Sequence, residues 1–96
     1  ANAWLTEATT NDALELLLGA SSAQILLSLT APATTLELSR KLKLAAGGVS
    51  HHLSKLSEAG LITAQRQGRE VYYHLTNTGE GLLALFEKQA AFAEVA

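Results

Sequence analysis

The sequence of 96 residues is 48% hydrophobic and contains no cysteine, so we expect one folded domain without disulfides or thiolate metal ligands. No apolar run approaches the roughly 18 residues typical of a membrane span, and we expect a cytoplasmic protein with no membrane partner. The formal net charge is −2, but residues 40–69 hold six basic residues against one acid, a local charge of +5, which is typical of an anion-binding surface.

Two short helices are predicted in the first third of the chain. Residues 1–9 form a loose lead-in, and "DALELLLG" then predicts a helix that Gly19 ends. The next apolar run, "AQILLSLT", predicts a second helix with Ser21 or Ser22 as its N-cap and an end before Pro32. The sequence also lacks methionine, from which we expect a processed form or a piece of a longer protein.

The middle of the chain predicts a pair of helices joined by a tight turn. Thr34 and Glu37 have the spacing of a capping box, which predicts a short helix over residues 35–42. The following segment, "AAGGVSHHLSKLSEAG", carries three apolar residues at i, i+4 and i+7 that form one stripe. It predicts a second helix around residues 46–59, ended by Gly60.

The apolar period changes after residue 60. The runs "LITAQR" and "EVYYHL" are rich in β-branched and aromatic residues and are separated by "QGR", which predicts a β-hairpin. A last helix follows in "NTGEGLLALFEKQAAFAE", with Asn77 or Thr78 as its N-cap. The predicted fold class is therefore mainly α with a small β-hairpin, a winged helix-turn-helix. Its single domain spans residues 1–96, with the helix-turn-helix at 34–60, the wing hairpin at 61–75 and the C-terminal helix at 77–94.

Two adjacent histidines, His51 and His52, raise the question of a metal or catalytic site. Successive helical side chains point about 100° apart, so the pair cannot close on one metal ion as an i, i+4 pair can. The only aspartate, Asp12, lies far away in the sequence, and no nucleophile, base and orienting acid come together. We therefore expect no enzyme, no bound metal and no cofactor.

The helix around residues 46–59 has an outward face suited to DNA. With its apolar stripe turned inward, the side chains that point outward are small, polar or basic, as a major-groove reader requires. They are Gly47, Ser50, His51 and Ser54, with Lys55 on the flank. His52 lies at the edge of the apolar stripe, where we expect partial packing and one hydrogen bond, to the backbone or to a phosphate.

Gly47 and Gly48 leave two explanations open. Inside the helix, they let its N-terminus, with free N–H groups and a partial positive charge, approach a phosphate or a base edge closely. Alternatively, they form the turn before the helix. The lack of larger side chains there also favours an alternative function, a winged-helix module for protein–protein interaction or dimerisation with weak or no DNA binding.

The stretches "VSHHLSKLSEAGLI" and "AQRQGREVYYHLT" resemble the winged-helix regulators of the ArsR type, with a match over residues 17–85. The resemblance implies a bacterial transcriptional regulator, commonly a homodimer and usually a repressor that an inducer releases from double-stranded DNA. By position it makes Ser50 and His51 DNA-facing residues. It places Arg66 and Arg69 in the wing near the minor groove. The ligand sets of the metal-sensing members are missing, so the resemblance does not extend to metal sensing.

Two sets of site residues are predicted. The predicted contacts for sequence-specific DNA binding are Gly47, Gly48, Ser50, His51, Ser54, Lys55, Arg66, Gln67 and Arg69. The terminal helices carry more apolar surface than a core of this size covers, so we expect a homodimer through them. Its predicted interface consists of Leu14, Leu17, Leu82, Leu85, Phe86 and Phe92.

Overall fold

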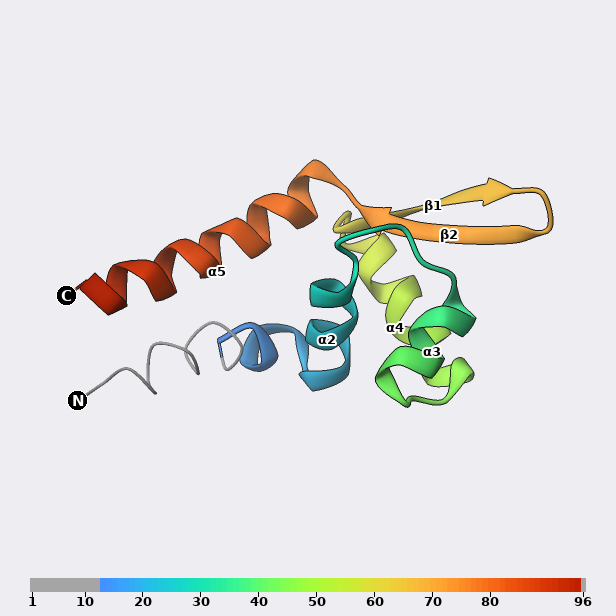
Figure 1. Cartoon of the computed structure of the whole chain (residues 1–96), viewed down its shortest axis with the longest axis horizontal. Coiled ribbons are helices and arrows are strands. Elements are labelled where there is room, and N and C mark those ends of the chain that lie inside the picture. The colour runs from blue at the N-terminus through green and yellow to red at the C-terminus, as the bar shows by residue number, and fades with distance from the viewer. Residues whose placement is uncertain (1–12, 96) are drawn as a thin grey trace.

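Helices and one hairpin follow one another along the chain in the computed structural model, which describes the backbone of residues 13–95 and the side chains of residues 13–86. The elements are α2 (Ala20–Ser28), α3 (Thr35–Leu42), α4 (Ala46–Glu58), β1 (Ile62–Gln67), β2 (Glu70–Leu75) and α5 (Asn77–Val95), as Figure 1 shows. A further helical segment at residues 13–18 precedes α2. This mainly α fold with one antiparallel hairpin is a winged helix-turn-helix, and the predicted fold class is confirmed.

Three short helices, α2, α3 and α4, enclose the core together with the start of the wing. The buried side chains are aliphatic: Ile25, Leu26, Leu29, Leu38, Val49, Leu53, Leu56, Leu61 and Ile62. The three residues contributed by α4 fall at i, i+4 and i+7, so the apolar stripe predicted for this helix faces the core. Burying such side chains stabilises the fold by about 1.5–3 kcal/mol each, which fixes the rotation of α4 and turns its other face to solvent.

The capping box predicted for α3 is present. Thr34 Oγ1 accepts a hydrogen bond from the Glu37 N–H (3.1 Å), and Glu37 Oε1 accepts one from the Thr34 N–H (2.9 Å). The helix ends at Lys43, which adopts a left-handed conformation (φ 57°) and donates its N–H to the Ser39 carbonyl. Local hydrogen bonds therefore set both ends of α3, and the turn that follows leads directly into α4.

The N-cap of α2 differs from the prediction. The helix starts at Ala20 with Gly19 as its N-cap and has no side-chain cap. Neither Ser21 nor Ser22 caps it, because both already lie inside its first turn. Ser22 is instead buried against α4, where its hydroxyl has another function.

The N-cap of α5 is Thr76, one residue before the predicted Asn77 or Thr78. Its Oγ1 accepts a hydrogen bond from the Gly79 N–H (3.1 Å) and donates one to the Gly60 carbonyl (2.6 Å). A Cβ atom at position 79 would overlap the backbone of the loop that follows α4, so only glycine allows this close approach. The start of α5 is thus held against the end of α4, and the helix then runs away from the wing (Figure 1).

The wing is a two-stranded antiparallel hairpin that extends away from the helices (Figure 1). Its register places Ile62 opposite Leu75, and its turn contains Gly68 with φ 64°, a conformation that glycine adopts without steric cost. The backbones of Ala33 and Tyr73 exchange two hydrogen bonds of 3.0 and 2.8 Å. This bridge ties the base of the wing to the segment before α3.

Candidate nucleic-acid interface

Helix α4 presents one exposed face, built from residues that the sequence predicts to contact DNA. The exposed residues are Gly47, Gly48, Ser50, His51, Ser54 and Lys55. They share this face because the apolar residues of α4 are buried against α2 and α3. No acidic residue occurs on α4 before Glu58, at its C-terminal end. The face therefore offers hydroxyl, imidazole and ammonium groups without a competing carboxylate in its first three turns.

The two glycines lie inside the first turn of α4, so they do not form a turn before the helix. The helix begins at Ala46, and its N-cap, Ala45, provides no side-chain hydrogen bond. Neither Gly47 nor Gly48 has a positive φ, and a Cβ atom at either position would meet nothing within 4 Å. The chain's own packing does not require glycine here. The first N–H groups of the helix, which have no intrahelical acceptor, are accessible from outside.

His52 forms the single hydrogen bond expected for it, but with a partner that sequence reasoning missed. Its Nδ1 lies 3.1 Å from Ser22 Oγ, on α2, whereas the expected partner is a backbone group or a phosphate. The imidazole of His51 packs edge-on against that of His52, with ring centroids 5.7 Å apart. A serine within the apolar run of α2 was the only sequence signal for this contact, and a separation of 30 residues hides the pairing.

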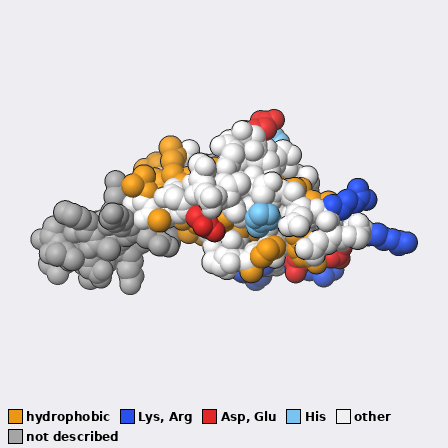
Figure 2. Space-filling model, turned by 90° about the horizontal axis from the view of Figure 1, so that it is seen from above, with side chains coloured by type: hydrophobic (Ala, Val, Ile, Leu, Met, Phe, Trp, Pro, Cys, Tyr) orange, Lys and Arg blue, Asp and Glu red, His pale blue; other side chains and the backbone are white. Residues whose placement is uncertain are grey.

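The wing carries the other predicted contacts. Arg66, Gln67 and Arg69 are all exposed at or beside the hairpin turn, and Arg66 Nε donates to the Gly68 carbonyl at 3.3 Å. Figure 2 shows basic side chains projecting at the end of the molecule where the wing lies. The predicted contacts therefore lie on two separate elements, α4 and the wing. A winged helix-turn-helix needs two such elements to contact the major groove and, separately, the backbone or the minor groove.

A carboxylate at the wing is already engaged. Tyr72 donates its hydroxyl proton to Glu70 Oε2 at 2.7 Å. This hydrogen bond, and next the negative charge of Glu70, raise the pKa of Tyr72 above its usual value of 10.0. Tyr72 thus stays neutral at physiological pH, and the wing gains no second negative charge from it.

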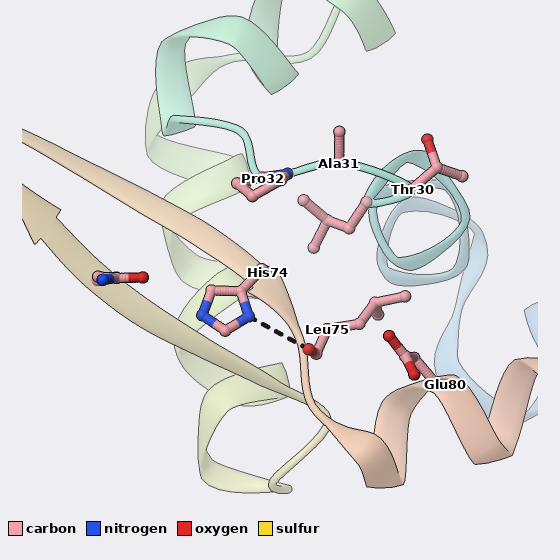
Figure 3. Close-up of a pocket in the computed structure, with 8 residues that line it drawn as sticks. Thr30, Ala31, Pro32, His74, Leu75 and Glu80 are labelled. Carbon is pink, nitrogen blue, oxygen red and sulfur yellow. Dashed lines mark hydrogen bonds between the residues drawn. The ribbon is translucent and has the colours of Figure 1, made fainter.

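A shallow hollow of about 310 Å³ lies at the base of the wing (Figure 3). It is lined by Leu29, Thr30, Ala31, Pro32, Gln65, His74, Leu75 and Glu80. His74 Nδ1 donates to the Leu75 carbonyl at 3.2 Å, because a carbonyl oxygen only accepts. Within the part of the chain that the structure describes, no three potential metal-binding side chains come together, here or elsewhere. Nor is any helix in that part long and apolar enough to cross a membrane.

The residues predicted for a dimer interface differ in their exposure. Leu17 and Leu85 are exposed, at 62% and 56%, and Leu82 and Phe86 are partly buried. Leu14 is fully buried within this chain, so its side chain serves the chain's own core and is not open to a partner. The side chain of Phe92 lies outside the described residues.

A wing beside a pair of helices, with an exposed polar face on the second helix, defines the winged helix-turn-helix class of proteins. The family model described as a helix-turn-helix domain matches residues 18–65, half of the chain. The chain belongs to this helix-turn-helix family. No curated protein matches it.

Solved structures share the fold at low sequence identity. Transcriptional regulator Tm0710 of Thermotoga maritima has a TM-score of 0.81 at 20% identity, over 95% of this chain and 69% of that one. MarR of E. coli has a TM-score of 0.73 at 22% identity, over 88% and 67%. HlyU of Vibrio cholerae has a TM-score of 0.64 at 23% identity, over 90% and 95%. The chain therefore spans about two thirds of the first two proteins and nearly all of the third.

Proposed function

We propose that the chain is a sequence-specific DNA-binding transcriptional regulator. Helix α4 enters the major groove, and the wing contacts the backbone or the minor groove. The observation that carries this proposal is the placement of charge: six basic side chains on α3, α4, the turn between them and the wing are exposed, and none forms an ion pair within residues 13–86. Cations that no carboxylate of the described side chains neutralises are available to bind phosphates and release counterions from DNA.

The exposed face of α4 has the chemistry of base readout. The hydroxyls of Ser50 and Ser54 both donate and accept hydrogen bonds, and so does the neutral imidazole of His51. These groups match the donors and acceptors of base edges in the major groove. In helix-turn-helix proteins the N-terminal residues of the second helix contact the bases. There Gly47 and Gly48 let the backbone itself come close to the duplex.

We propose a homodimer through the segment 13–18 and α5, with the exposed Leu17 and Leu85 in the contact. A two-fold dimer presents two α4 helices to half-sites about one DNA turn apart. We further propose a repressor of the ArsR type that acts in the cytoplasm and has no catalytic activity. In support, the motif around α4 and the wing resembles that type, and Tm0710, which shares the fold, is described as a transcriptional regulator.

This function is tested by measuring, at increasing salt concentration, binding to duplex DNA from the region upstream of the gene that encodes the protein. If all six cations of a protomer contact phosphates, the slope of log K against log salt is expected to be about −5 for each bound protomer and about −11 for the homodimer, since each contact contributes roughly −0.9. If the protein does not bind DNA, or if its affinity does not change with salt concentration, the alternative function as a protein–protein interaction module is favoured. Footprinting of the same region locates the half-sites, and loss of the gene should raise transcription from that promoter if the protein is a repressor.

A further inference from the structure

Ser22 is a buried polar side chain on α2. It is 6% exposed, and its neighbours Ala23 and Ile25 on α2 are fully buried. A buried hydroxyl without a hydrogen bond destabilises the folded state. Its partner is His52 Nδ1 on α4, at 3.1 Å, and no other group within the described residues bonds to it. This contact joins the core to the edge of the candidate DNA-binding face.

The direction of the Ser22–His52 hydrogen bond determines which nitrogen of His52 carries the proton. A hydroxyl has one proton to donate, and each ring nitrogen of a neutral imidazole either donates or accepts. Within residues 13–86, His52 Nδ1 is the one group hydrogen-bonded to the Ser22 hydroxyl. If Ser22 donates this hydrogen bond, Nδ1 accepts it and the neutral ring carries its proton on the other nitrogen, Nε2.

The Nε2 atom of His52 is not fully buried. It has no hydrogen-bond partner among the described residues, yet His52 is partly buried. In the same part of the chain no buried side-chain nitrogen or oxygen lacks a partner. Nε2 is consequently at least partly accessible, which distinguishes His52 from a histidine whose two nitrogens are both satisfied inside the core.

The surroundings of His52 suit a phosphate. Gly48 lies one turn before it and Lys55 almost one turn after it, on the same flank of α4. Gly48 has no side chain that would cover the imidazole. A Cβ atom added at Gly48 would meet nothing within 4 Å. Lys55 is exposed and adds a positive charge. An N–H donor beside a cation and an open helix terminus is an arrangement that binds phosphate oxygens.

We propose that His52 donates its Nε2–H to a phosphate of the DNA backbone, and that Ser22 is the positioning residue that holds the proton on Nε2. This inference rests on the proposed DNA-binding function and adds to it a contact residue and a residue of α2 that acts from within the core.

The position of the proton is tested first, on the wild-type protein without DNA. Long-range ¹H–¹⁵N NMR spectra of the imidazoles above pH 8 are expected to show His52 with a bare Nδ1 and a protonated Nε2. The Ser22→Ala variant is expected to show a mixture of both tautomers and DNA binding at least threefold weaker. A wild-type His52 with its proton on Nδ1 would overturn the assignment without any substitution, as would a Ser22→Ala variant whose tautomer and affinity are both unchanged.

Two substitutions of His52 separate the role of each nitrogen in DNA binding. The amide nitrogen of glutamine lies where Nε2 does, so His52→Gln keeps the outward donor and is expected to bind within threefold of wild type. Asparagine places an amide oxygen near Nδ1 and can accept from Ser22, but it has no group at the Nε2 position. His52→Asn is therefore expected to bind all duplexes about tenfold or more weakly, the cost of a hydrogen bond to a charged group.

The salt slope and the fold provide the remaining controls. Because a neutral N–H releases no counterion, His52→Asn should leave the salt slope unchanged, and circular dichroism should show both variants folded. An asparagine variant that binds as tightly as wild type would overturn the phosphate contact. If wild type itself does not bind DNA, the proposed function fails together with the contact, whereas the NMR result on Ser22 and the tautomer remains valid.

Discussion

Replacing Gly47 and Gly48 by alanine is expected to stabilise the fold and to weaken DNA binding at the same time. Both glycines lie inside α4 with negative φ, and the added methyl groups would meet nothing within 4 Å. Alanine favours a helix over glycine by about 0.5–1 kcal/mol per residue. The double variant should therefore gain about 1–2 kcal/mol, and Tm should rise by roughly 4–8 °C per kcal/mol for a domain of this size.

The loss of affinity has a separate origin. In the proposed complex, the N–H groups at the start of α4 approach the duplex. The methyl groups of the two alanines would lie between these N–H groups and the DNA. Loss of one hydrogen bond to a charged phosphate costs about 1.5–3 kcal/mol, which corresponds to about tenfold or more in Kd. Thermal denaturation followed by circular dichroism measures the first effect, and fluorescence anisotropy with a labelled duplex at constant salt measures the second.

Gly81 provides the matched control. It lies inside α5, is exposed, and a Cβ atom added there would also meet nothing within 4 Å, so Gly81→Ala should stabilise the chain without changing DNA affinity. A Gly47/Gly48 double variant that is more stable and binds DNA as tightly as wild type would refute the close approach of the backbone. A double variant that is less stable would refute the claim that glycine at these two positions lowers the stability of α4 and is not required by packing.

Three further predictions concern α5, the wing and assembly. Gly79→Ala should lower Tm, the opposite of Gly81→Ala, because its Cβ would overlap the Leu61 carbonyl oxygen; an unchanged Tm would contradict the close packing of α5 on that loop. Replacing Arg66 and Arg69 by alanine should reduce the magnitude of the salt slope by about 1.8 for each bound protomer, or ~0.9 for each phosphate contact, and an unchanged slope would exclude both contacts. Leu85→Glu should shift the protein toward monomer in analytical ultracentrifugation, since it places a charge on an exposed apolar site; a dimer of undiminished stability would place the interface elsewhere.

Features that depend on residues close together in the chain could be predicted from the sequence. The capping box of Thr34 and Glu37 involves groups three residues apart, so its spacing alone defines α3. The buried stripe of α4 follows from helical periodicity, and this stripe also determines which residues of α4 face outward. The hairpin follows from two β-rich runs around a glycine turn. Each of these rests on local geometry that the backbone repeats in any protein.

Only the tertiary structure decided the features that join distant segments. The N-cap of α5 is Thr76 because its hydroxyl also reaches Gly60, at the end of α4, and Leu14, predicted for a dimer interface, is fully buried within the chain. The Ser22–His52 hydrogen bond spans 30 residues and depends on how α2 packs against α4. A hydroxyl in an apolar run indicates that a partner is needed, but which partner it finds depends on the distance between two helices, which no local pattern encodes.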